Sequence, residues 1–91
     1  MTLRRTSRRD DNEMPIIRAL EAIGAQVKPL HRPCDLLVRW RGQIHLLEID
    51  NPASKYRQRD AKQLEFLRLW EVAMVQTPAE AFHAIGASHH A

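Results

Sequence analysis

The sequence predicts an α/β fold in which helices cover a mixed β-sheet. Residues 34–40 and 43–49 are apolar, alternate like strands and are separated only by Arg41-Gly42, which is typical of a tight β-hairpin. Segments with helical spacing precede this hairpin and alternate with one more short strand after it. The 91 residues, 44% hydrophobic and 27% charged, are enough for one packed domain.

The segment before the hairpin predicts a helix and then a strand. Residues 11–23 can begin with an Asp or Asn cap, and Pro15 fits the first helical turn because its missing N–H is not needed there. The apolar side chains that recur at helical spacing are Ile16, Ile17, Leu20 and Ile23. Gly24 is expected to end this helix. Residues 25–30 alternate as a short strand, and Pro29 favours an edge position.

The segment after the hairpin predicts a loop and three further elements. Residues 50–59 form the loop, and Asp60 is expected to cap a helix over residues 61–70. The side chains expected to face inward from this helix are Leu64, Leu67 and either Phe66 or Trp70. Residues 72–76 form a short buried strand, and residues 77–86 begin with Thr-Pro and a capping-box glutamate that predict a last helix. The predicted order is α-β-β-β-α-β-α.

Positive charge is concentrated at the N-terminus. The sequence has 14 Lys and Arg residues; the four in the first nine positions leave ten against all 11 acidic residues in the remainder. These four are Arg4, Arg5, Arg8 and Arg9. Residues 1–10 are expected to be a flexible basic arm that either follows the phosphates of a nucleic acid or is simply solvated. Residues 11–87 would form the folded domain and residues 88–91 a disordered tail.

The sequence gives no indication of a membrane or secretory segment. Its apolar runs are shorter than the roughly 20 residues that cross a bilayer, and no secretory leader is recognisable, so a cytoplasmic protein is expected. The single cysteine, Cys34, cannot form an internal disulfide and has no zinc-ligand spacing around it. A thiol nucleophile is also not expected, because no base partner for Cys34 can be identified.

Three carboxylates interrupt the most apolar part of the chain. Glu48 and Asp50 share one face of their strand, and Asp35 is expected opposite Glu48 across the hairpin. Buried carboxylates require a partner. One candidate is a hard divalent cation such as Mg²⁺ or Mn²⁺. The other is a set of ion pairs with nearby basic residues, for which the candidates are Arg39, Lys55, Arg57 and Arg59.

Residues 11–86 resemble a small VRR-NUC-type member of the PD-(D/E)XK nuclease superfamily, of the stand-alone sort found in phages and prophages. The motifs that carry the resemblance are DNE at the start of the first helix, IGAQV, CDLLV, GQIHLLEI and the closing TPAEAFHAIG. The resemblance implies a restriction-endonuclease-like αβββαβ(α) core. It also implies a Mg²⁺- or Mn²⁺-dependent DNA endonuclease, with flaps or junctions as candidate substrates, that works as a homodimer in a bacterial host cell.

The resemblance assigns roles to five residues. Asp35 matches the Asp of the PD element, and Glu48 matches the acidic position of the (D/E)XK element. Glu13 matches a first-helix glutamate that completes the acidic cluster, and Ile49 would offer its backbone carbonyl to the metal. Gln63 matches a helix glutamine that borders the active site. The implied metal-binding set is therefore Glu13, Asp35, Glu48 and Ile49.

Two departures from the family pattern alter what is expected. Cys34 separates Pro33 from Asp35, where the family usually has the two residues adjacent. Asp50 stands where the family has a lysine that stabilises charge on the phosphate.

The replacement of the family lysine by Asp50 has several possible interpretations. Lys55 or Lys62 could take over the role of that lysine, or Asp50 could itself act as a further metal ligand. Alternatively, the chain is a catalytically impaired nuclease fold that binds DNA or serves as an assembly subunit. The loop residues Lys55, Arg57 and Arg59 are expected to neutralise flanking phosphates or to be solvated.

Overall fold

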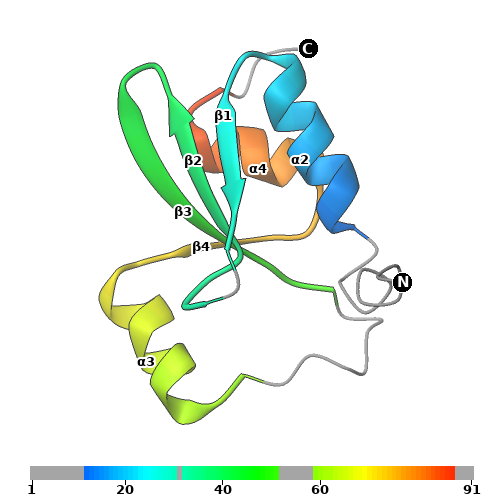
Figure 1. Ribbon diagram of the computed structural model, residues 1–91. Coiled ribbons are helices and arrows are strands. Elements are labelled where there is room, and N and C mark those ends of the chain that lie inside the picture. The colour runs from blue at the N-terminus through cyan, green and yellow to red at the C-terminus, as the bar shows by residue number, and fades with distance from the viewer. Residues whose placement is uncertain (1–11, 31, 52–58, 88–91) are drawn as a thin grey trace, which may run out of the picture.

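The computed structural model describes residues 12–30, 32–51 and 59–87, which form three helices and four strands (Figure 1). In chain order these are α2 (Glu13–Ala22), β1 (Gln26–Pro29), β2 (Leu36–Trp40), β3 (Gln43–Ile49), α3 (Ala61–Leu69), β4 (Ala73–Val75) and α4 (Pro78–Ile85). The predicted element order is therefore confirmed. The longest of these helices has 10 residues, and within the described ranges none could cross a membrane.

The four strands form one mixed sheet with the spatial order β1-β2-β3-β4. β1, β2 and β3 pair in antiparallel fashion, whereas β4 pairs with β3 in parallel after the crossover through α3. Arg41 and Gly42 join β2 to β3, and both have a positive φ, of 50° and 79°. This conformation suits a two-residue hairpin because its twist matches that of the strands. The coarse α/β class and the hairpin predicted from the sequence are both confirmed.

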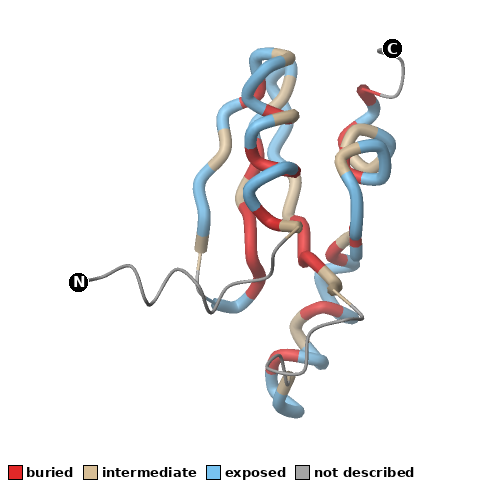
Figure 2. Tube along the Cα trace, turned by 90° about the vertical axis from the view of Figure 1, so that its right-hand side faces the viewer, coloured by how far each residue is buried: buried red, intermediate tan, exposed pale blue. Residues whose placement is uncertain are grey.

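The main apolar core lies between the sheet and the pair of helices α2 and α4, which contact each other (Figure 1). Figure 2 shows buried residues on the central strands and along the helices. The largest fully buried apolar side chains in this core are Ile16, Leu20, Leu36, Leu47, Ile49, Val38 and Val75. The helical spacing that predicted the first helix therefore identifies the face of α2 that packs on the sheet.

A second, smaller apolar cluster consists of Cys34, Leu67 and Val72, with Leu46 packed against it. Leu47 belongs to the main core, and successive side chains of a strand point to opposite faces. The two clusters therefore lie on opposite faces of the sheet, and α3 belongs to the face away from α2 and α4.

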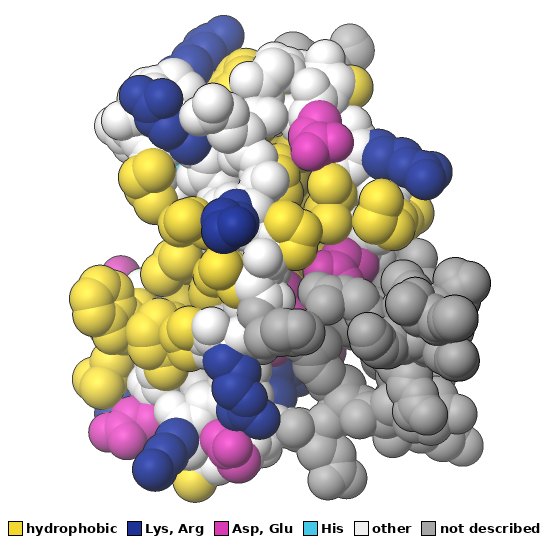
Figure 3. Space-filling model, viewed as in Figure 1, with side chains coloured by type: hydrophobic (Ala, Val, Ile, Leu, Met, Phe, Trp, Pro, Cys, Tyr) yellow, Lys and Arg dark blue, Asp and Glu magenta, His cyan; other side chains and the backbone are white. Residues whose placement is uncertain are grey.

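The predicted packing of α3 is partly wrong. Leu67 is buried and Phe66 packs against its cluster, as expected, whereas Leu64 is 52% exposed and Trp70, the alternative to Phe66, is exposed. Trp70 stacks on the half-buried ring of Phe66, with 5.6 Å between ring centroids. The reason is that the small cluster around Cys34 contacts only one side of the helix, so apolar residues on its other sides reach the surface. Figure 3 shows hydrophobic side chains exposed in this part of the molecule.

The predicted caps of α3 and α4 are present. The Asp60 carboxylate accepts a hydrogen bond from the Gln63 backbone N–H (2.8 Å), and the Thr77 hydroxyl accepts one from the Glu80 backbone N–H (3.1 Å). Glu80 also accepts a hydrogen bond from the backbone N–H of Gln76, one residue before the cap. These side chains satisfy N–H groups that a helix start leaves without backbone partners.

The start of α2 differs from the prediction. Asn12 occupies the cap position, but its side chain makes no capping hydrogen bond. Its amide Nδ2 donates instead to the backbone carbonyls of Asp50 (3.2 Å) and Gln76 (2.9 Å). Asn12 therefore ties the start of α2 to the chain leaving β3 and β4.

Candidate functional site

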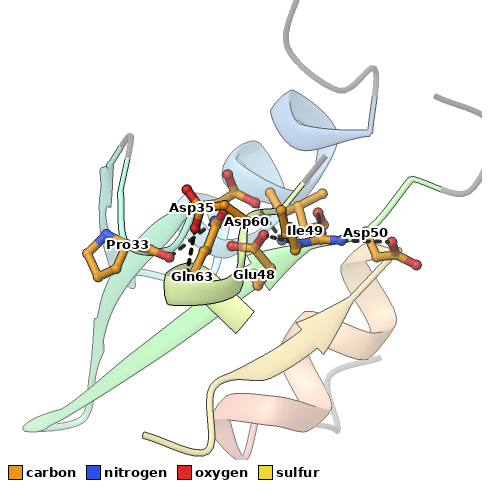
Figure 4. Close-up of polar contacts among 8 residues, drawn as sticks. Pro33, Asp35, Glu48, Ile49, Asp50, Asp60 and Gln63 are labelled. Atoms are coloured by element: carbon orange, nitrogen blue, oxygen red, sulfur yellow. Dashed lines mark hydrogen bonds and ion pairs between the residues drawn. The ribbon is translucent and has the colours of Figure 1, made fainter. Parts of the chain in front are cut away.

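Asp35 and Glu48 lie side by side because of the hairpin register. Leu36 pairs with Leu47, which places the next positions outward, 35 and 48, directly opposite each other. Both residues are buried, and Glu48 is 0% exposed. The Asp35 carboxylate accepts a hydrogen bond from the Ile49 backbone N–H at 2.8 Å. Figure 4 shows both side chains at the end of the hairpin, as predicted.

Arg59 is the observed partner of two of these carboxylates. Its Nε donates to Glu48 Oε2 at 2.6 Å, and its Nη2 donates to the Ile49 carbonyl at 3.1 Å. Its Nη1 lies 3.8 Å from Asp50 Oδ1. The Arg59 side chain is only 15% exposed. Of the two alternatives left open by the sequence, ion pairing is thus observed for Glu48 and Asp50.

Asp50 lies at the rim of this group and is held by β4 and its neighbours. Its backbone N–H donates to the Val75 carbonyl at 2.9 Å, and Gln76 Nε2 donates to its carboxylate at 3.2 Å. The side-chain amide of Asn12 donates a hydrogen bond to the Asp50 backbone carbonyl. Position 50 is therefore surrounded by groups that fit a carboxylate, and a lysine there would lose the contacts with Arg59 and Gln76.

Gln63 borders the group from α3. It is buried, and its Nε2 donates to the Pro33 carbonyl at 3.3 Å (Figure 4). Because Pro33 lies two positions before Asp35, this bond connects α3 to the segment that carries Asp35.

The remaining candidates fall at different places. Glu13 is buried at the first position of α2, whose start Asn12 ties to the end of β3. Lys62 is exposed on α3. Lys55, Arg57 and the four arm residues Arg4, Arg5, Arg8 and Arg9 lie outside the described residues.

We call Asp35, Glu48, the Ile49 carbonyl and Asp50 the acidic centre. All of its ligand atoms are oxygens, which is the donor type that Mg²⁺ and Mn²⁺ prefer. The oxygens of Glu48, Ile49 and Asp50 already face the guanidinium of Arg59. In the described ranges, no three His, Cys, Asp or Glu side chains are arranged to hold a metal ion.

Cys34 lies beside the acidic centre but is poorly suited to nucleophilic chemistry. Burial raises the pKa of its thiol to about 11, and the charges of Glu48 and Asp35 act in the same direction. A thiol with this pKa is protonated at neutral pH, and only the thiolate is nucleophilic. This agrees with the interpretation of Cys34 from the sequence.

The folded protein is expected to resist thiol reagents. With a pKa of about 11, only about 10⁻³ of the Cys34 thiol is ionised at pH 8, and its side chain is buried. Labelling with Ellman's reagent at pH 8 should therefore be far slower than labelling of the same protein unfolded in guanidinium chloride. Comparable rates in the two conditions would contradict the burial of Cys34.

The sequence names Arg59 as one of four candidate partners of the carboxylates, and the structure pairs it with Glu48. The contacts that Asn12 and Gln76 make at this site are not evident from the sequence. Asn12 was considered only as a cap. Its alternative role was not visible, because it depends on two carbonyls that are distant in the sequence.

Comparisons with protein-family models, curated proteins and solved structures found no match for this chain.

Proposed function

We propose that this protein is a Mg²⁺- or Mn²⁺-dependent endonuclease that hydrolyses DNA phosphodiester bonds, with flaps and junctions as candidate substrates. The observation that carries the proposal is the placement of two buried carboxylates, Asp35 and Glu48, opposite each other, with Asp35 accepting a hydrogen bond from the backbone N–H of Ile49. These are the positions that the PD-(D/E)XK resemblance assigns to the metal. The order of helices and strands is compatible with that assignment.

The residues in and around the centre have two proposed roles, metal binding and positioning. Asp35, Glu48 and the Ile49 carbonyl would hold the cation. When bound, such a cation lowers the pKa of a water molecule and polarises the scissile phosphate. Gln63 is a positioning residue, because it holds the segment before Asp35 through the Pro33 carbonyl. The basic arm and the loop residues Lys55 and Arg57, which would contact DNA, lie outside the described residues.

A second candidate function is a catalytically impaired nuclease fold that binds DNA or acts as an assembly subunit. The observation that favours it is the shared contact of Glu48 and Asp50 with Arg59. This contact compensates the buried charge of Glu48 without a metal, and Asp50 replaces the lysine that the resemblance would require.

The test compares cleavage by the wild-type protein, Glu48→Gln, Asp50→Lys and the control Glu65→Gln. Supercoiled, linear and four-way-junction DNA are incubated with each protein, first in Mg²⁺ and then in Mn²⁺. Glu48→Gln keeps an oxygen acceptor for Arg59 but removes the charge, so cleavage should fall by about 100-fold or more. Glu65 is exposed on α3, so its substitution should leave cleavage unchanged. Circular dichroism checks that each variant is folded.

Three outcomes separate the candidate functions. Undiminished cleavage by Glu48→Gln would remove the acidic centre from the proposal. If the wild type does not cleave DNA but Asp50→Lys does, the chain is a catalytically impaired nuclease. If none of the proteins cleaves DNA, a DNA-binding or assembly role is the better candidate. The salt-dependent DNA affinity should then survive Glu48→Gln and weaken on deletion of residues 1–9.

A further inference from the structure

Arg59 occupies the acidic centre as a cation. Each of its three guanidinium nitrogens faces a different oxygen: Glu48 Oε2 at 2.6 Å, the Ile49 carbonyl at 3.1 Å and Asp50 Oδ1 at 3.8 Å. Two carboxylates and a carbonyl thus surround one positive charge. A hard divalent cation would draw on the same kinds of oxygen.

Burial makes a positive charge at this place necessary. Glu48 is 0% exposed, and a buried carboxylate without compensation is strongly unfavourable. Arg59, at 15% exposure, supplies the compensation. The carboxylates of Glu48 and Asp50 face a single guanidinium charge, whereas a divalent cation in the place of Arg59 would match the charge of both.

The position of Arg59 in the chain permits its side chain to move out of the acidic centre while α3 stays folded. The next residue, Asp60, caps that helix through its own carboxylate and also pairs with Arg32 on the surface. The start of the helix is therefore fixed independently of the Arg59 side chain. The Arg59 side chain is partly exposed, so it can move toward solvent.

We propose that Arg59 is the internal cation of the acidic centre and that a divalent cation binds there only by displacing it. Arg59 then sets the metal affinity, because it stabilises the metal-free state and competes for the oxygens of Glu48 and Ile49. This inference rests on the proposed function, which supplies the divalent cation.

The test uses Arg59→Met, which keeps much of the aliphatic length and removes the charge. Arg68→Met is the matched control, since Arg68 is exposed in the last turn of α3. Binding of Mn²⁺ is measured by isothermal titration calorimetry, and the melting temperature is measured in EDTA and in Mn²⁺. Both readouts are independent of DNA cleavage.

In EDTA, Arg59→Met should have a lower melting temperature than the wild type. Mn²⁺ should restore that melting temperature, because the metal replaces the lost positive charge. Its apparent Kd for Mn²⁺ should be lower by about ten-fold or more, since no competing state has to be displaced. Arg68→Met should behave like the wild type. If Arg59→Met does not fold, Arg59→Lys is used instead: it keeps the charge with fewer donors and should bind Mn²⁺ more tightly than the wild type, whereas equal affinity would overturn competition by Arg59.

The outcomes distinguish this inference from the proposed function. If the wild type and Arg59→Met bind Mn²⁺ with equal affinity, Arg59 does not compete with the metal. If adding Glu48→Gln then abolishes binding in both proteins, the proposed metal centre is still supported. No Mn²⁺ binding by any variant would overturn both. Tighter binding by Arg59→Met without any cleavage of DNA would support the role of Arg59 and count against the nuclease.

Discussion

Asp35→Ala is expected to lower the free energy of unfolding by about 2 kcal/mol, whereas Asp35→Asn should retain most of that stability. The Asp35 carboxylate accepts a hydrogen bond from the buried Ile49 N–H at 2.8 Å. Alanine would leave this donor without its acceptor, but the asparagine side-chain oxygen can replace it. Both variants remove a proposed metal ligand, so both should lower cleavage by about 100-fold or more.

The comparison separates structural from catalytic loss at Asp35. Urea unfolding gives the stability of each variant, and the DNA cleavage assay gives its activity. Asp60→Asn is the control, because asparagine is also a good helix cap and Asp60 lies outside the acidic centre. Full cleavage by a folded Asp35→Asn variant would contradict the assignment of Asp35 to the centre.

Leu20→Ala is expected to lower the free energy of unfolding by about 3 kcal/mol, within the usual range for a fully buried leucine. Leu20 is 0% exposed and lies in the main core. Small domains have only about 5–15 kcal/mol of stability in total, so this loss would be a large fraction of it.

Leu69→Ala serves as the control for this prediction, because Leu69 is 59% exposed at the end of α3. Its substitution should change stability by less than about 0.5 kcal/mol. Urea unfolding at a fixed temperature measures both variants. Similar losses for Leu20→Ala and Leu69→Ala would contradict the division between buried and exposed apolar residues described above.

Much of the centre could be predicted because its geometry is local. Once Arg41-Gly42 is recognised as a two-residue turn, the antiparallel register follows and places position 35 opposite position 48. The alternation of side chains then separates Glu48 from Leu47 and Ile49. The caps Asp60 and Thr77 were equally predictable, since each bonds to a backbone N–H three positions away.

The rest could not be predicted because it depends on contacts between distant segments. Arg59 has many possible partners in the sequence, and its pairing with Glu48 follows only from where α3 starts relative to β3. Asn12 bonds to carbonyls more than 30 positions away, which no local pattern encodes. Leu64 was wrongly expected to be buried, because the small cluster beside α3 covers only the side of the helix that carries Leu67.

The separation of the two apolar clusters implies that the molecule has two levels of local stability. The main core joins α2, α4 and the sheet, whereas α3 is held by the smaller cluster of Cys34, Leu67 and Val72. Elements with fewer buried contacts open at lower free energy than the global transition. The labelling rate of Cys34 therefore reports this partial opening. The acidic centre lies between these two regions: Glu48 is on the more stable sheet, and its partner Arg59 is on the segment that opens first.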